Sequence, residues 1–172
     1  MDDAKGLLAA LAAVVGEDHV VSAPEELACY GVDAAKVRAV PDVVVRPATA
    51  AEVSGVLRLA NERRVPVYPR GAGSGLTGGA SPLRGGIALE MARMNRILSV
   101  DPDDLVAVVE PGVVLADLQA AVERKGLFYP PDPASSGFCT VGGTLAACAG
   151  GLHCVKYGVT RDYLLSAEAV LP

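Results

Sequence analysis

Residues 65–90, VPVYPRGAGSGLTGGASPLRGGIALE, hold the residue types and spacing with the clearest chemical meaning. Five glycines crowd one loop of this segment: Gly71, Gly73, Gly75, Gly78 and Gly79. Because glycine adopts positive φ without steric cost, successive backbone N–H groups can point into one concavity, and such a nest suits an anion, most often a phosphate. Arg70, at the mouth of the loop, would add a fixed positive charge and a forked donor.

The sequence around this loop excludes two common phosphate-binding motifs. Residues 73–78 spell G-x-G-x-x-G, but the dinucleotide motif of that spelling needs a helix immediately afterwards. Pro82, Gly85 and Gly86 follow instead, and no Lys-Ser or Lys-Thr pair completes a Walker A loop. We therefore expect backbone N–H groups of the loop itself to hold a pyrophosphate. A flexible hairpin loop without a ligand is the alternative.

The elements before the loop predict where it lies. The β-branched run at residues 42–47 predicts a strand, and Thr49 with Glu52 forms a capping box that opens a helix ending before Pro66. Residues 65–68 predict the next strand, so we expect a parallel strand pair with a right-handed crossover. The glycine loop then leaves the carboxyl end of a strand, where ligands of α/β sheets usually bind.

The remaining pattern predicts mixed helices and strands. We expect helices at 4–15, 114–125 and 144–149, one turn at 24–27 capped by Ser22, and extended segments at 19–21, 86–91, 97–100, 105–109 and 167–171. The polar turn at 101–104 is a candidate boundary between two lobes. Residues 129–137 carry three prolines and cannot be regular, so they form a ligand wall or a plain connector. The helix expected at 144 would offer free N–H groups to an anion or a carbonyl-rich ring.

Composition excludes several classes of function. The chain has 172 residues and a formal net charge of -5, which argues against nucleic acid or an anionic membrane as the main partner. No apolar run approaches the roughly 20 residues of a membrane span, and the acidic start is unlike a secretory signal, so we expect a cytoplasmic protein. Cys29, Cys139, Cys148 and Cys154 form no C-x-x-C pair, so we expect reduced, buried thiols and no metal site.

Six strings, in order, resemble the FAD-binding domain shared by vanillyl-alcohol-oxidase-type and p-cresol-methylhydroxylase-type flavoproteins, nearest to the glycolate oxidase D subunit and D-lactate dehydrogenase group. They occupy residues 69–79, 110–112, 129–135, 139–143, 149–151 and 156–162. The resemblance spans about residues 20–172. It implies a two-lobed α+β fold with FAD between the lobes, truncated at its carboxyl end. After an N-terminal helical segment at 1–37, the FAD-binding domain would be 38–172, with lobes at about 38–102 and 103–172.

The resemblance also implies which residues contact FAD. The pyrophosphate would be cradled by Arg70, Gly71, Ala72, Gly73, Ser74, Gly75 and Gly79. The adenosine side would be bordered by Pro111 and Gly112. The ribityl and ring side would be lined by Pro131, Asp132, Ser135, Thr140, Gly142, Gly143, Gly150, Gly151, Tyr157 and Gly158. Some relatives attach FAD through a histidine in the first loop, where Ser74 stands here, so we expect non-covalent FAD.

The activity that the resemblance implies is dehydrogenation or oxidation of small 2-hydroxy acids of the glycolate or D-lactate type, with hydride transfer from the substrate α-carbon to the flavin. The family's base, substrate arginine and metal ligands lie in a C-terminal domain beyond this chain, so we name no catalytic residue and expect little turnover from this part alone. Substrate would bind through that domain, and an electron acceptor or partner subunits would complete the system. The alternatives are an enolpyruvyl-sugar reductase, an aldonolactone oxidase, or a non-catalytic phosphate- or nucleotide-binding module.

Overall fold

The computed structural model describes residues 2–172, with side chains from Lys5 onward, and these residues form two compact units. The first unit extends to Arg93 and includes Ala169–Pro172, and the second is Met94–Glu168. Both contain helices and strands, as the α+β prediction requires. None of the helices between residues 2 and 172 has the length and apolar composition needed to cross a bilayer.

The first unit is built on a four-stranded sheet in the order β1-β2-β4-β3. Its strands are β1 (Val20–Val21), β2 (Val43–Val45), β3 (Val67–Arg70) and β4 (Ile87–Glu90). β1 runs antiparallel to β2, whereas β2, β4 and β3 are parallel. The side chains of β2, and of β4 up to Leu89, are buried, as expected of parallel strands that are covered on both faces.

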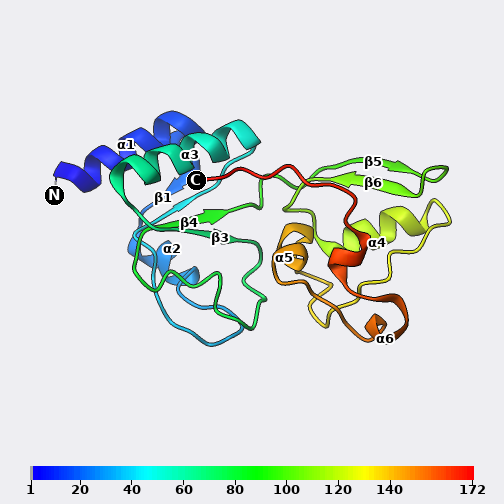
Figure 1. The fold of residues 1–172 in the computed structure, drawn as a ribbon. Helices are drawn as coiled ribbons and strands as arrows, with labels where there is room; N and C mark the ends of the chain where they lie inside the picture. Colours follow the sequence, from blue (N-terminus) through cyan, green and yellow to red (C-terminus); the bar gives the residue numbers. More distant parts are fainter. Residues whose placement is uncertain (1) are drawn as a thin grey trace. The chain divides into compact units, whose positions relative to one another are not determined.

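Helices cover both faces of this sheet (Figure 1). α1 (Asp2–Val15) and α3 (Ala50–Arg63) lie side by side on one face, where Leu11 and Val56 are fully buried. On the other face, Leu27 of α2 (Pro24–Cys29) packs with Val21, Val44 and Ala88. A short 3-10 helix, η1 (Glu17–His19), joins α1 to β1.

The predicted cap of α3 is confirmed, with one change. Thr49 Oγ1 accepts the Glu52 N–H at 3.1 Å, but the Glu52 carboxylate accepts the N–H of Ala48 (2.8 Å) instead of that of Thr49. The cap expected at Ser22 is wrong, because Ala23 precedes α2 without a side-chain bond and Pro24 occupies the first turn. Proline there needs less capping, since its ring removes one of the free N–H donors.

β2 and β3 are parallel, as predicted for the strand–helix–strand unit, but they are not neighbours in the sheet. β4 lies between β2 and β3, so that Ala88 pairs with both Val44 and Tyr68. The physical reason is burial: Ile87, Ala88 and Leu89 are almost fully enclosed, which an interior place in the sheet provides, whereas β3 is only partly buried and lies at the edge. The glycine loop still leaves the carboxyl end of β3.

The second unit packs a hairpin and a helix around one small core. β5 (Ile97–Asp101) and β6 (Val106–Val109) are antiparallel, and α4 (Leu115–Glu123) contributes Leu118 and Val122 to the core. The polar turn at 101–104 joins these two strands, and Asp101 Oδ1 accepts the N–H groups of Asp103 and Asp104. The shorter helices are α5 (Val141–Ala146), α6 (Cys154–Tyr157) and the 3-10 helix η2 (Thr160–Tyr163).

Three further expectations need correction. α5 begins three residues earlier than predicted, because Thr140 caps it by accepting the Gly143 N–H at 3.3 Å. Residues 167–171 form no strand, since no described strand pairs with them, and Leu171 is 80% exposed. All four cysteines are free as expected, but only Cys139 is buried, whereas Cys29 at the end of α2 is exposed. The irregular conformation predicted for 129–137 is confirmed.

Candidate functional site

The glycine loop at 71–79 begins directly after Arg70, at the edge of the sheet where β2 and β4 also end. Gly73 and Gly78 have positive φ values of 69° and 75°, as the nest prediction requires of some of its glycines. Much of the loop is exposed, and the side chain of Leu76 is 78% accessible. The loop therefore presents backbone groups to solvent at the usual ligand-binding edge of parallel strands.

Arg70 does not lie at the mouth of this loop. It is only 7% exposed, and its guanidinium turns inward. Nη2 donates to the carbonyl of Val32 at 2.8 Å, and Nη1 donates to those of Tyr30 (3.3 Å) and Ala80 (3.4 Å). These three N–H groups thus donate to the protein's own carbonyls.

Gly73 is a glycine because the fold requires one. Besides its positive φ, a Cβ there would collide with the guanidinium of Arg70. The Gly73 carbonyl also accepts the Ala34 N–H at 3.0 Å, which fixes the loop against the segment after α2. Packing within the chain explains this position without any ligand.

Gly75 has no such internal reason. Its φ lies outside the left-handed region, and no heavy atom lies within 4 Å of the place that a Cβ would take. Gly79 is similar, since the nearest atom to its Cβ position is Thr77 Oγ1 at 3.9 Å. Space beside bare backbone is what a closely bound phosphate needs, so the loop fits the pyrophosphate of a dinucleotide.

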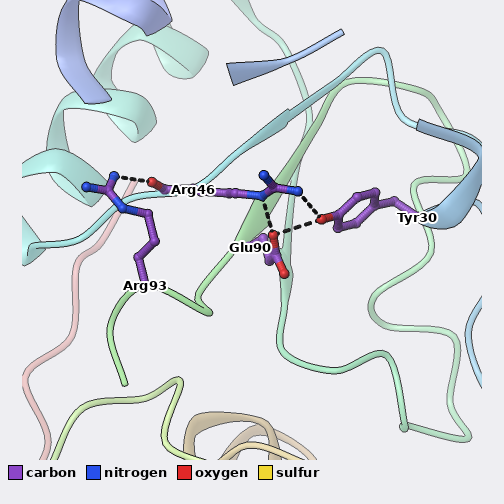
Figure 2. A network of polar contacts seen from close by, with 4 residues as sticks. All are labelled: Tyr30, Arg46, Glu90 and Arg93. Atoms are coloured by element: carbon purple, nitrogen blue, oxygen red, sulfur yellow. Dashed lines mark hydrogen bonds and ion pairs between the residues drawn. The ribbon is translucent and has the colours of Figure 1, made fainter. Parts of the chain in front are cut away.

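A polar network links the ends of two parallel strands (Figure 2). The Tyr30 hydroxyl donates to Glu90 at 2.9 Å, while Arg46 donates to the same hydroxyl (2.8 Å) and to Glu90 (2.7 Å). Arg93 donates to the Arg46 carbonyl at 2.7 Å. Burial, with a contribution from Glu90, raises the pKa of Tyr30 above its usual value.

Sequence reasoning missed this network, although a signal was present. Arg46 directly follows the apolar run of β2, and Glu90 ends that of β4. Charged residues at the carboxyl ends of neighbouring parallel strands meet at one edge of the sheet. Tyr30 carried no such signal, because it comes from the segment after α2.

In the second unit, Pro111 and Gly142 are brought together. The Gly142 N–H donates to the Pro111 carbonyl at 2.8 Å, and a Cβ on Gly142 would lie 2.6 Å from Pro111 Cβ. The neighbouring first-turn N–H groups are bonded too: Val141 donates to Val113, and Gly143 to Thr140 Oγ1. The free N–H groups expected at the start of this helix are therefore already satisfied by the chain.

Glu110 anchors the turn that carries Pro111 and Gly112. Its carboxylate accepts from Arg96 Nη2 (2.6 Å), Arg96 Nε (3.0 Å) and the Arg96 backbone N–H (2.8 Å). These bonds hold the pKa of Glu110 below its usual value. The Gly112 N–H donates to the Met94 carbonyl at 2.7 Å, so both ends of the turn are tied to the segment just before β5.

The segments expected on the ring side of the cofactor are packed against each other. A Cβ on Gly151, whose φ is 135°, would collide with the Asp132 carbonyl. His153 Nδ1 lies 3.3 Å from the Pro130 carbonyl oxygen and 4.0 Å from Asp132 Oδ2. Gln119 donates to the Pro131 carbonyl at 3.0 Å. Pro131, Asp132 and Gly151 thus lie together, held by the body of the unit.

The remaining residues expected on the ring side have mostly structural contacts. Gly150 packs against Cys154 and Val159, and a Cβ on Gly158 would collide with the Asp162 carboxylate. The Ser135 carbonyl accepts two N–H groups, from Phe138 and Cys139. Tyr157 meets Phe128 and His153 edge-on and is 38% exposed.

The two sets of residues belong to different compact units, and their convergence on one dinucleotide stays a prediction. Among the side chains that the structure describes, from Lys5 onward, no three His, Cys, Asp or Glu residues are grouped so that they could hold a metal ion.

Comparison with known proteins identifies the family. Residues 41–172 match the family described as FAD binding domain. The chain belongs to this family of FAD-binding domains. FAD is therefore the cofactor of this domain, and the predicted family is confirmed.

This FAD-binding domain is 47% identical over 143 residues to glycolate oxidase subunit GlcD of Bacillus subtilis (strain 168), covering 83% of this chain and 30% of the relative. It is 44% identical over 148 residues to D-lactate dehydrogenase of Anaerostipes hadrus, covering 86% and 30%. The chain thus spans about 30% of the length of these relatives. A solved structure of p-cresol methylhydroxylase with substrate bound aligns with a TM-score of 0.73 at 25% identity, covering 84% of this chain and 29% of that one, which confirms the predicted fold type.

Proposed function

We propose that this FAD-binding domain belongs to a flavin-dependent dehydrogenase or oxidase of small 2-hydroxy acids, of the glycolate or D-lactate type. The names of the relatives, glycolate oxidase subunit GlcD and D-lactate dehydrogenase, support this substrate class. Bound FAD would supply the acceptor for the hydride that leaves the substrate α-carbon. No residue of this chain is proposed as catalytic, so its own task is to bind and orient the cofactor.

The observation that carries the proposal is the room beside Gly75. Backbone N–H groups of residues 71–75 and Gly79 would hold the pyrophosphate, since the chain leaves the space next to Gly75 open. The turn with Pro111 and Gly112 would border the adenosine. The ring side would be formed by the packed segments that carry Asp132, Ser135, Gly143, Gly151 and Tyr157.

We further propose that FAD is bound without a covalent bond. Ser74 stands in the glycine loop where some flavoproteins of this fold use histidine. A serine hydroxyl is a poor nucleophile without an adjacent base, and no hydrogen bond from a histidine to Ser74 exists among the described residues. Acid precipitation of the reconstituted protein should therefore release all of the flavin to the supernatant.

The proposed pyrophosphate site is tested by substituting two glycines, Gly75 and Gly137, that both have free space at the Cβ position. Gly137, like Gly75, has no atom within 4 Å of its Cβ position and no positive φ, and it is not among the residues proposed to contact FAD. FAD affinity is measured by quenching of flavin fluorescence. We expect Gly75→Val to weaken FAD binding by roughly tenfold or more, about 1.4 kcal/mol, and Gly137→Val to leave it unchanged.

Equal thermal unfolding of both apo variants would show that the effect is local. Unchanged affinity in Gly75→Val would contradict the proposed pyrophosphate site, and no FAD binding by the unmodified protein would favour a non-catalytic module. The substrate class is tested on the longest protein that the gene encodes. Anaerobic glycolate or D-lactate should bleach its flavin absorbance, and L-lactate should not.

A further inference from the structure

We propose that Arg70 and Tyr30 form a clamp that shapes the glycine loop before the cofactor arrives, and that Arg70 acts through the loop without touching the phosphates. This inference rests on the proposed function of the loop. It makes Arg70 a positioning residue whose effect on FAD comes from its forked geometry, not from its charge alone.

The guanidinium of Arg70 ties three places in the chain together. Arg70 itself ends β3 and starts the loop, Nη1 holds the carbonyl of Ala80 just beyond the far end of the loop, and Nη2 holds the carbonyl of Val32. The start and the end of the glycine loop are thus fixed to one another and to the segment after α2. A planar guanidinium can donate to several carbonyls at fixed angles, which an ammonium group cannot do in the same way.

The surroundings of Arg70 indicate a structural charge. Its partners are neutral carbonyls, and no carboxylate oxygen of the described residues lies within 4.0 Å of it. A Cβ on Gly73 would collide with Nη2 and Cζ of the same guanidinium. Three of the five guanidinium N–H groups donate to the carbonyls of Tyr30, Val32 and Ala80, and a phosphate would reach those three only if the carbonyls were displaced.

Tyr30 connects the clamp to the sheet. Its ring centroid lies 5.6 Å from Arg70 Cζ and 6.0 Å from Arg46 Cζ, so guanidinium groups from the ends of β3 and β2 both approach the ring. Its hydroxyl is fixed by Arg46 and Glu90 (Figure 2). Through Tyr30, the glycine loop is therefore connected to the carboxyl ends of all three parallel strands.

The segments that the clamp holds each contain a buried polar atom without a partner in the described part of the chain. Asp33 comes directly after Val32, and Ser81 directly after Ala80, the two residues whose carbonyls Arg70 binds. Asp33 Oδ2 and Ser81 Oγ are both buried without a hydrogen-bond partner among the described residues. Because buried polar atoms without partners cost free energy, other interactions must keep these segments in place. The bonds of Arg70 to the two preceding carbonyls are suited to do so.

The experiment separates charge from geometry with Arg70→Lys and Arg70→Met. Arg58, which is exposed on α3, supplies the matched controls Arg58→Lys and Arg58→Met. If Arg70 positions the loop, both Arg70 variants should lose FAD affinity by similar factors, roughly tenfold or more, within about threefold of each other. The Arg58 variants should bind as the unmodified protein does. Near-normal binding by Arg70→Lys, or by both Arg70 variants, would overturn the proposal.

A second readout needs no flavin. In the apo-protein, both Arg70 variants should speed amide hydrogen exchange in residues 31–39 and 71–82, while α1 and α3 stay protected. Unchanged exchange in these segments would overturn the clamp. This arm remains decisive even if the protein fails to bind FAD, which would overturn only the proposed function.

A third measurement covers variants that do not fold. In the unmodified protein without FAD, the guanidinium protons of Arg70 should exchange slowly with water, as measured by NMR. Adding FAD should change their chemical shifts little. If these protons exchange slowly only when FAD or inorganic pyrophosphate is present, Arg70 contacts the phosphate directly, and the proposal is overturned.

Discussion

The guanidinium of Arg70 occupies the space that a Cβ on Gly73 would need, and Gly73 has a φ of 69°, which residues with a side chain rarely adopt. Gly73→Ala therefore introduces both a collision and backbone strain, and we expect it to lower the free energy of unfolding by about 1–3 kcal/mol. Gly75→Ala, where neither applies, should leave stability unchanged. Chemical denaturation of the apo-proteins measures both, and equal stability of the two variants would contradict this account of Gly73.

The hydrogen bonds from Arg96 to Glu110 predict a dependence of stability on pH. The folded protein holds the pKa of Glu110 below its usual value of 4.5, so the pair stabilises the fold above that pH. This stability is lost as the pH falls through the lowered pKa. Melting temperature should therefore fall less steeply below pH 4.5 in Glu110→Gln than in the unmodified protein. Because Arg96 is 69% exposed, we expect salt to reduce the difference, and parallel profiles at low salt would refute the assignment.

The network at the strand ends predicts unequal costs for its members. Tyr30→Phe removes two hydrogen bonds but leaves Arg46 bonded to Glu90 at 2.7 Å, so we expect a loss of about 0.5–1.5 kcal/mol. Glu90→Leu should cost more, because it removes the only carboxylate that Arg46 contacts among the described residues. A double-mutant cycle by urea denaturation measures the coupling between Tyr30 and Glu90. Strictly additive losses would mean that the two residues act independently.

In the second unit, Gly151 should be the glycine least tolerant of substitution. Its φ is 135°, and a Cβ would run into the Asp132 carbonyl, which is backbone and cannot rotate away. We expect Gly151→Ala to cost at least about 1–3 kcal/mol, seen as a lower melting temperature. Gly137→Ala, in open space on the same unit, is the matched control. A normal melting temperature for Gly151→Ala would show that the segments at 132 and 151 are less closely packed than described.

Local pattern was a good guide where a single segment carries its own signal. The apolar faces of α1 and α3, the Thr49 cap and the β-branched run of β2 were all readable, because helix period, capping and strand propensity act over a few neighbouring residues. Local pattern does not predict which strands lie next to one another in the sheet. β4 enters between β2 and β3 because its burial demands the central position, which no local pattern expresses.

By itself, the sequence determined most of the elements, the family and FAD as the cofactor, since ordered glycine and proline strings need no tertiary information to be recognised. Tertiary structure alone decided what each glycine and charge is for. Arg70 turns inward to carbonyls that are 40, 38 and 10 residues away, and the first N–H groups of α5 donate to acceptors within the chain. In the glycine loop, Gly75 and Gly79 keep open space beside them. A residue's type limits the bonds it can make, but its partners are chosen by segments distant in sequence that packing brings to it.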